Sequence, residues 1–162
     1  MLRVLFICTG NTCRSPMAEA MLRAKAAESP ISDSLLVLSA GTSAWEGNPA
    51  SGGALAAMRE INIDLTSHRS RRVAADYIQA ADIILTMTQG HRRSVIAAFP
   101  GAADKIFTLA EFAGSDQDID DPYGGDIAEY RNCREQIRLL IDLVWEKLVE
   151  RAGKSRDAEK EN

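Results

Sequence analysis

A polar loop between an apolar run and a helix-forming segment is the feature that most constrains how this sequence can fold. Residues 3–7 form a largely apolar run, typical of a short buried strand. The loop of residues 8–15 follows, and residues 16–27 are rich in strong helix formers. Ser15 and Pro16 predict the helix start, as a capping hydroxyl followed by proline at the first helical position. The chain is therefore expected to open with a strand, a loop and a helix.

The same alternation continues along the rest of the chain. Further strands are expected at residues 35–38, 83–87 and 105–109, and helices at residues 53–61, 73–81, 91–99 and 126–151. This order predicts the α/β class, a three-layer sandwich in which a four-stranded parallel sheet carries helices on both faces. Ligands bind such sheets beyond the carboxyl ends of the strands, where the loop after the first strand lies. We expect one domain over residues 1–151 and a charged, disordered tail over residues 152–162.

Composition excludes several classes of function. A net charge of -4 gives no overall basic field for nucleic acid or for an anionic membrane. No apolar run approaches the ~20 residues that span a membrane, and the N-terminal residues lack the layout of a signal peptide. Three cysteines fit a reducing compartment better than a disulfide framework. We expect a cytoplasmic monomer with neither nucleic acid nor membrane as a partner.

The loop combines the elements of a phosphate site. Cys8 and Arg14 are separated by five residues. Backbone N–H groups between a strand and a helix can converge on an anion, and Gly10 is expected to allow a backbone conformation that a side chain forbids. Arg14 offers a planar donor fork that matches two phosphate oxygens. The same field should lower the pKa of the Cys8 thiol from roughly 8.5 and make it a nucleophile. A structural Cys8 with a surface Arg14 is the alternative, but the combination favours the catalytic interpretation.

The other cysteines allow more than one interpretation. Cys13 either can form a disulfide with Cys8 on oxidation or only packs against its neighbours. Cys133 is expected on the apolar face of the last helix, as a core residue. The spacing of Cys8 and Cys13, with both histidines far away in sequence, does not match a zinc pattern. No metal and no cofactor are expected.

Two motifs resemble those of the low-molecular-weight protein phosphatases. Residues 4–16, Val-Leu-Phe-Ile-Cys-Thr-Gly-Asn-Thr-Cys-Arg-Ser-Pro, look like the signature of that family, and Asp-Pro-Tyr-Gly at residues 121–124 looks like its general-acid loop. The resemblance extends over nearly the whole chain and implies a phosphorylated protein as substrate. It also implies that Cys8 forms a phosphocysteine while Arg14 and the loop amides hold the phosphoryl oxygens. Asp121 would protonate the leaving group and then activate water.

The resemblance also assigns supporting roles. Asp121 is preferred over Asp120 as the acid because it directly precedes proline. Ser15 should hydrogen-bond to the Cys8 thiolate. The remaining loop residues that should bind phosphate or brace the loop are Thr9, Gly10, Asn11, Thr12 and Cys13. Ser39 and His68 are expected behind the loop, and Trp45 and Tyr123 are expected as aromatic walls of the substrate cleft.

Two of these residues have alternatives, and one further histidine lacks a motif. His68 could instead lie at the surface, and Trp45 could instead belong to the core. His91 matches no motif and is expected at the surface.

Thr12 bears on the choice of substrate. Animal tyrosine phosphatases of the family typically carry a branched aliphatic residue at this position, whereas the bacterial protein-arginine phosphatases carry threonine. A hydroxyl can accept a hydrogen bond from a guanidinium N–H, and a phenyl ring offers it no partner. Gly124 stands where animal members usually have a second tyrosine. We therefore expect phosphoarginine in proteins as the substrate. A protein tyrosine phosphatase is the alternative, and a thiol-dependent arsenate reductase is a distant one.

Overall fold

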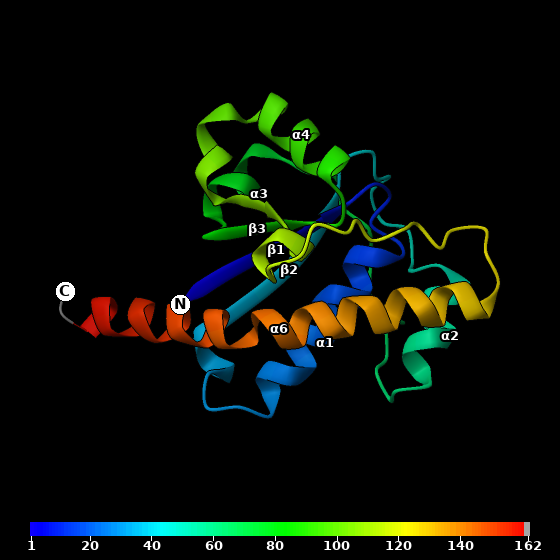
Figure 1. The fold of residues 1–162 in the computed structure, drawn as a ribbon, viewed down its shortest axis with the longest axis horizontal. Helices are drawn as coiled ribbons and strands as arrows, with labels where there is room; N and C mark the ends of the chain where they lie inside the picture. The colour runs from blue at the N-terminus through cyan, green and yellow to red at the C-terminus, as the bar shows by residue number, and fades with distance from the viewer. Residues whose placement is uncertain (161–162) are drawn as a thin grey trace.

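The computed structural model describes residues 1–160 and has a parallel four-stranded sheet at its centre (Figure 1). The strands are β1 (Leu2–Cys8), β2 (Leu35–Gly41), β3 (Ile83–Thr86) and β4 (Ile106–Thr108). Their order across the sheet is β2-β1-β3-β4, and every neighbouring pair is parallel. β1 is thus a central strand, and its carboxyl end delivers the candidate loop to the middle of one edge of the sheet.

Helices cover both faces of the sheet and form two cores with it. The α-helices are α1 (Arg14–Ala27), α2 (Gly52–Arg59), α3 (Ala75–Ala80), α4 (Gln89–Ala98), α5 (Leu109–Phe112) and α6 (Ile127–Lys160), with 3₁₀ turns η1 (Ser32–Ser34) and η2 (Pro100–Lys105). Helices α1, α2 and α6 lie on one face, and α3 and α4 lie on the other (Figure 1). Successive side chains of β1 alternate between the two cores: Phe6 belongs to the first and Ile7 to the second. The predicted three-layer sandwich is confirmed. Within residues 1–160, each helix is too short or too polar to cross a lipid bilayer.

The start of α1 differs in detail from the prediction. Cys13, not Ser15, is the cap residue, and its side chain makes no capping hydrogen bond. Ser15 lies inside the helix and turns its hydroxyl to Cys8 Sγ at 2.9 Å. Pro16 still falls in the first turn, where a missing N–H costs nothing because those groups have no intrahelical acceptor. The expected Ser15 cap is wrong, since the hydroxyl serves the loop rather than the helix terminus.

The last helix is longer than the sequence predicts. α6 continues to Lys160, across most of the segment for which a disordered tail is expected. Ala152 is fully buried, and Lys154 Nζ lies 2.6 Å from Glu150 Oε1 one turn earlier. Charged residues with long side chains suit an exposed helix as well as a disordered tail, so composition alone misplaces the boundary. Residues 161–162 of the expected tail lie outside the described residues.

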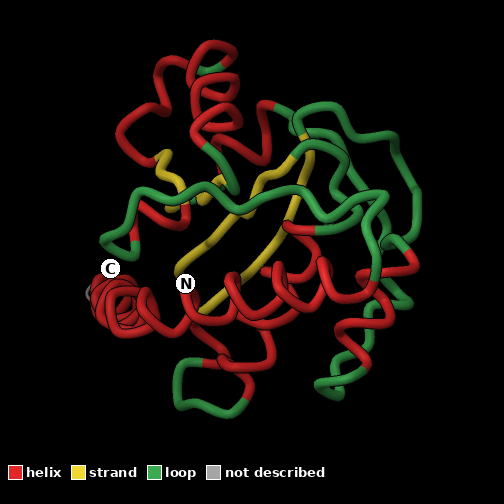
Figure 2. Tube along the Cα trace, turned by 45° about the vertical axis from the view of Figure 1, so that its right-hand side comes forward, coloured by secondary structure: helices red, strands yellow, loops and turns green. Residues whose placement is uncertain are grey.

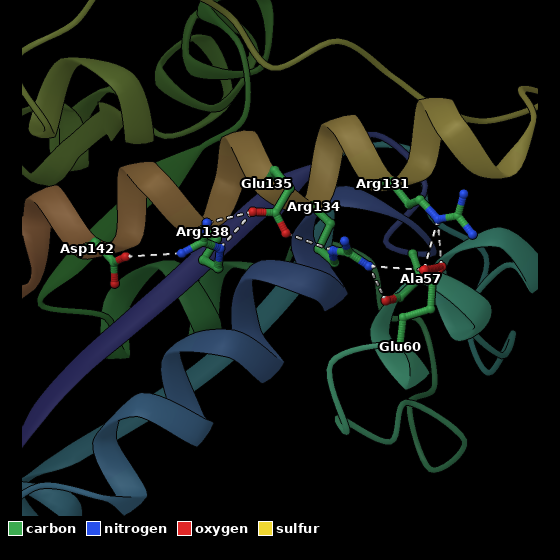
Figure 3. Close-up of polar contacts among 7 residues, drawn as sticks. All are labelled: Ala57, Glu60, Arg131, Arg134, Glu135, Arg138 and Asp142. Atoms are coloured by element: carbon green, nitrogen blue, oxygen red, sulfur yellow. Dashed lines mark hydrogen bonds and ion pairs between the residues drawn. The ribbon is translucent and has the colours of Figure 1, made fainter.

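A row of charged side chains on α6 contacts the end of α2 (Figure 3). Arg131 Nε lies 2.8 Å from Glu60 Oε2 at the end of α2, and Arg134 Nη1 donates to the Ala57 carbonyl oxygen at 2.7 Å. The row continues along α6 through Glu135, Arg138 and Asp142. Exposed pairs of this kind contribute little stability each. The hydrogen bond from the buried Arg134 fixes α2, and with it the end of the preceding loop of residues 42–51.

Three segments that are distant in sequence meet at the carboxyl edge of the sheet (Figure 2). The loop after β2 is tied to the loop after β1, because the Ser43 N–H donates to the Thr9 carbonyl oxygen at 3.0 Å. The loop before α6 is tied to the end of β3, because the Ile119 N–H donates to the Met87 carbonyl oxygen at 3.0 Å. The candidate site is built where these loops converge.

Candidate active site

Cys8 is the last residue of β1 and lies at the bottom of the loop. Its side chain is 2% exposed, and its Sγ lies 2.9 Å from Ser15 Oγ. Ser15 Oγ also accepts a hydrogen bond from Asn11 Nδ2 at 2.9 Å. With its oxygen engaged by Asn11, the Ser15 hydroxyl is left to donate its proton to the Cys8 sulfur, which favours a thiolate.

A buried carboxylate sets the direction of these hydrogen bonds. Glu19 is 7% exposed and accepts from Ser39 Oγ, and a carboxylate can only accept. Ser39 Oγ must then accept from Asn11 Nδ2, at 2.9 Å. The side-chain oxygen of Asn11 accepts from the Arg71 N–H at 2.9 Å, which fixes the orientation of the amide independently. The predicted roles of Asn11 and Ser39 in bracing the loop fit these contacts, and Glu19 is a partner that lies outside both motifs.

Asn11, not Gly10, takes the unusual backbone conformation of the loop. Asn11 has φ 55°, whereas Gly10 is not among the residues with positive φ. A Cβ added at Gly10 would make only an ordinary contact, 3.6 Å from Thr12 Oγ1. The conformational role expected for Gly10 is therefore wrong. Asparagine tolerates the left-handed region, and here its side-chain hydrogen bonds hold it there.

The glycine that the loop does require is Gly41, at the end of β2. A Cβ built there would lie 2.4 Å from the Thr9 carbonyl oxygen and 2.9 Å from the Asn11 backbone nitrogen. Real Cβ atoms do not approach backbone that closely, so any side chain at this position would push the loop away. The sequence shows no local sign of this requirement, because it arises from the pairing of β1 with β2.

Burial and polar contacts act in opposite directions on the pKa of Cys8. Burial raises the pKa of the thiol and is the largest effect. The Ser15 hydrogen bonds, the charge of Arg14 and a backbone hydrogen bond from Asn11 lower this pKa, but they do not outweigh burial. Burial therefore raises the pKa of Cys8, against the expectation of a lowered value. The groups that stabilise the thiolate are those expected. The effect of burial on the pKa, in contrast, does not follow from the spacing of residues in the sequence.

Arg14 connects the phosphate loop to the loop that carries Asp121. The arginine is 5% exposed, and its Nη1 donates to the Ile119 carbonyl oxygen at 2.9 Å. Its Nη2 lies 3.5 Å from Asp121 Oδ2, and that carboxylate is 50% exposed. The other carboxylate oxygen of Asp121 accepts from the Tyr123 N–H at 3.1 Å. One guanidinium therefore faces both the loop and the predicted acid, which supports the predicted assignment of Asp121.

The loop opens into a cleft of about 310 Å³. Its lining residues are Cys8, Thr9, Gly10, Thr12, Cys13, Arg14, Trp45, Asn48, Asp121 and Tyr123. Trp45 and Tyr123 are 80% and 74% exposed, so the alternative of a core position for Trp45 is wrong. Asn48 is the one lining residue absent from the predicted set, since it lies in a loop that only the fold brings to the cleft.

Cys13 and Cys133 are buried, and all three cysteines are unpaired. Cys13 Sγ donates to Ser51 Oγ at 3.2 Å and lies 3.5 Å from the hydroxyl of Tyr130 on α6. Cys133 is a core residue on α6, as expected, and burial raises the pKa of its thiol to about 12. Both interpretations of Cys13 stay open, because a thiol held by hydrogen bonds can still be oxidised.

The two histidines contact different residues of the loop. His68 Nε2 donates to the Asn11 carbonyl oxygen at 2.7 Å, in line with the predicted supporting role. Burial lowers the pKa of His68, and this hydrogen bond partly opposes the effect. His91 is 8% exposed, and its Nε2 lies 2.7 Å from Thr9 Oγ1, so its expected surface position is wrong. The pairing of β1 with β3 brings the start of α4, and His91 with it, beside the loop.

The buried His91 should make the stability of the fold depend on pH. Burial and the nearby Arg14 lower its pKa from 6.5 to about 4, while Asp118 and Asp121 partly oppose them. Between these values the unfolded chain binds a proton that the folded chain does not. Stability present above pH 6.5 should therefore be lost as the pH falls toward 4, by up to about 3 kcal/mol. Urea unfolding at pH 7 and pH 4.5 should show about 2 kcal/mol less loss for His91→Gln than for the wild type. Equal losses would contradict this prediction.

A family model described as low molecular weight phosphotyrosine protein phosphatase matches residues 3–154. The chain belongs to this family. It is 45% identical over 147 residues to a protein-arginine-phosphatase of Geobacillus stearothermophilus, covering 90% of this chain and 95% of that one. It is 34% identical to the low molecular weight protein-tyrosine-phosphatase PtpB of Staphylococcus epidermidis, with coverage of 88% and 96%. The family resemblance inferred from the two motifs is confirmed, and a phosphorylated protein is the substrate class that it implies.

Solved structures of phosphatases in this family share the fold. The YwlE arginine phosphatase from Geobacillus stearothermophilus superimposes with a TM-score of 0.87 at 43% identity, over 95% of this chain and 97% of that one. A low molecular weight protein tyrosine phosphatase from T. tengcongensis gives a TM-score of 0.86 at 42% identity, over 91% of this chain and 99% of that one. These two solved structures, named for different substrates, are thus similar to this phosphatase to nearly the same degree.

Proposed function

We propose that this protein hydrolyses phosphoarginine in proteins through a phosphocysteine intermediate on Cys8. The observation that carries the choice of substrate is Thr12, which is half-buried and lines the cleft above the nucleophile. The name of the relative with 45% identity, a protein-arginine-phosphatase, supports the same choice.

In the first step, the Cys8 thiolate attacks phosphorus and the bond from phosphorus to the leaving group breaks. Arg14 and the loop N–H groups hold the other phosphoryl oxygens, where charge develops. Asp121 gives its proton to the nitrogen or oxygen of the leaving group, which departs as the guanidinium of an arginine side chain or as a phenol. The 3.5 Å contact between Arg14 and Asp121 supports this assignment, because it places acid and phosphate binder at the same cleft.

In the second step, water attacks the phosphorus of the phosphocysteine. The Asp121 carboxylate, deprotonated in the first step, takes the proton of that water. The sulfur–phosphorus bond breaks, inorganic phosphate leaves, and the Cys8 thiolate is restored. Ser15 donates to the sulfur at 2.9 Å and so makes it a better leaving group. No redox partner takes part in either step.

The chemistry of the cleft suits a guanidinium leaving group. A phosphorylated guanidinium offers N–H donors, and the Thr12 hydroxyl and the Asp121 carboxylate are acceptors on the cleft lining. The exposed rings of Trp45 and Tyr123 can stack against its plane. Gly124, beside Tyr123, adds no second aromatic side chain.

Phosphotyrosine is the alternative substrate. The tyrosine phosphatase structure at 42% identity favours it, and the same two aromatic walls could accept a phenyl ring. Thiol-dependent arsenate reduction is the distant alternative and needs a further reactive cysteine. Cys133, the only cysteine after Cys13, is buried, and its pKa is raised to about 12.

We also propose a single-domain monomer that acts in the cytoplasm without metal, cofactor or nucleic acid. Three free, buried cysteines support a reducing compartment. The overall charge of -4 gives nucleic acid no general attraction.

Thr12→Ile should lower kcat/KM for phosphoarginine peptides by about tenfold to a hundredfold, because a donor of the leaving group loses its acceptor. The value for phosphotyrosine peptides should stay level or rise, since the new aliphatic surface packs against a phenyl ring. The measurement is the ratio of the two kcat/KM values on peptides of otherwise identical sequence.

Thr12→Ser is the matched control, since it keeps the hydroxyl and should keep the ratio near that of the wild type. A ratio that Thr12→Ile leaves unchanged would show that Thr12 does not select the substrate. A wild-type preference for phosphotyrosine would refute the arginine proposal but leave the proposed mechanism standing.

A further inference from the structure

His91 holds a position beside the nucleophile that the reaction described above does not use. It lies in the first turn of α4, where its backbone N–H donates to the Thr88 hydroxyl at 3.1 Å. Its ring is buried, and its Nε2 lies 2.7 Å from the hydroxyl oxygen of Thr9, the residue directly after Cys8. Thr9 itself is exposed and lines the cleft.

The second ring nitrogen shows which atom of this hydrogen bond carries the proton. His91 Nδ1 is buried without a hydrogen-bond partner among the described residues. A neutral imidazole has one N–H, and a buried N–H without an acceptor is rarer than a buried acceptor without a donor. The favoured tautomer therefore places the proton on Nε2, which donates to Thr9 Oγ1.

A charged ring would not fit this site. An imidazolium would carry a second N–H at Nδ1, buried and without an acceptor, and would place its charge near Arg14. Asp118 and Asp121 are the acidic groups that oppose this repulsion, and burial outweighs them. His91 therefore remains a neutral donor over the pH range in which a phosphatase is assayed.

Because the hydroxyl oxygen of Thr9 accepts a hydrogen bond from His91, the Thr9 O–H is free to donate to another acceptor. Thr9 lies at the cleft, and a phosphoryl group offers only acceptor atoms. We infer that His91 is a positioning residue, which holds the Thr9 hydroxyl with its O–H turned toward the phosphoryl group in the cleft. Neither motif of the sequence predicts this pair, since 82 positions separate the two residues.

The inference rests on the proposed phosphatase site but not on the identity of the leaving group. It can therefore be tested with two probes that do not depend on the natural leaving group. They are p-nitrophenyl phosphate, for kcat/KM, and inorganic phosphate, for its dissociation constant. Thr9→Val, which keeps the shape and removes the hydroxyl, should weaken phosphate binding and lower kcat/KM by about fivefold each.

Substitutions of His91 separate the role of Nε2 from that of the ring. The side-chain nitrogen of glutamine can reach the position of Nε2, whereas that of asparagine is too short. His91→Asn should match Thr9→Val, and His91→Gln should recover most of the loss. The double variant Thr9→Val/His91→Asn should be no worse than either single variant, since both remove one interaction.

Val95→Ala is the control for a merely structural effect. Val95 is buried on the same helix and belongs to the core on the far side of the sheet from α1. Its truncation should lower stability but leave phosphate binding unchanged. If Val95→Ala weakens binding as much as His91→Asn does, the effect of His91 is structural and the inference fails.

A spectroscopic measurement tests the tautomer directly. Long-range proton–nitrogen correlation spectra of the ring should show a protonated Nε2 and a bare Nδ1 from pH 8 down to pH 5. A proton on Nδ1, or titration of the ring near its ordinary pKa of about 6.5, would overturn the inference. Additive effects in the double variant would also overturn it. A wild-type protein that does not hydrolyse p-nitrophenyl phosphate would instead refute the proposed function.

Discussion

Replacing Cys8 with serine is expected to lower turnover of every phosphorylated substrate by at least about 10⁴-fold. A serine hydroxyl stays protonated at neutral pH, and among residues 1–160 no general base forms a hydrogen bond with this position. Its hydrogen-bond partners there are Ser15, which donates, and the loop backbone. Release of p-nitrophenol from p-nitrophenyl phosphate measures the loss, and binding of inorganic phosphate shows whether the loop survives.

Cys133→Ala is the matched control for that experiment. It removes a core thiol on α6 that is not among the residues lining the cleft, so kcat should remain near the wild-type value. Retention of full activity by Cys8→Ser would end the proposal of a phosphocysteine intermediate.

Asp121→Asn should slow the enzyme most on substrates with poor leaving groups. The amide cannot give a proton, so kcat for phosphotyrosine or phosphoarginine peptides should fall by about 10²- to 10³-fold. p-Nitrophenolate departs without a proton, so the first step with p-nitrophenyl phosphate should be much less affected. A rapid burst of p-nitrophenol followed by slow release of phosphate should then appear, because the second step still needs a base.

Asp120→Asn provides the comparison for the assignment of the acid. Asp120 is exposed and adjacent in sequence, but the ion pair with Arg14 is made by Asp121. Asp120→Asn should therefore cost less than about threefold in kcat, as for most surface substitutions away from such contacts. A larger loss for Asp120→Asn than for Asp121→Asn would reverse the assignment.

The sequence reveals those parts of the site that depend on local chain order. Cys8 ends a strand, and Arg14 and Ser15 begin the helix that follows after one short loop, so their meeting follows from the strand–loop–helix order alone. Asp121 is far from these residues in sequence. Its place in the cleft follows only from the motif of residues 121–124, which resembles that of a known family.

Non-local contacts account for what the sequence could not show. His91 looks like a surface histidine on a polar helix, and only the pairing of β1 with β3 buries it beside Thr9. Gly41 looks like an ordinary glycine after a strand until the loop backbone is placed against it. Burial likewise decides the direction of the Cys8 pKa, and burial depends on everything packed above the sulfur.

Local propensity also misleads where one residue satisfies two rules. Ser15 before Pro16 fits a helix cap, and the same hydroxyl is the one placed to donate to Cys8. Gly10 is the most permissive residue of the loop, yet Asn11 takes the left-handed conformation because four hydrogen bonds involving its side chain and backbone hold it there.

The two exposed rings at the mouth of the cleft have a consequence for how this scaffold can diversify. Trp45 and Tyr123 stand on loops, outside both cores, and the fold gains little from their burial. Substitutions of these two rings should change stability little, whereas Cys8 and Arg14, which act on the phosphorus, are buried in the framework of the fold. Paralogues could therefore exchange one phosphorylated side chain for another by altering the rim, while inheriting the reaction intact.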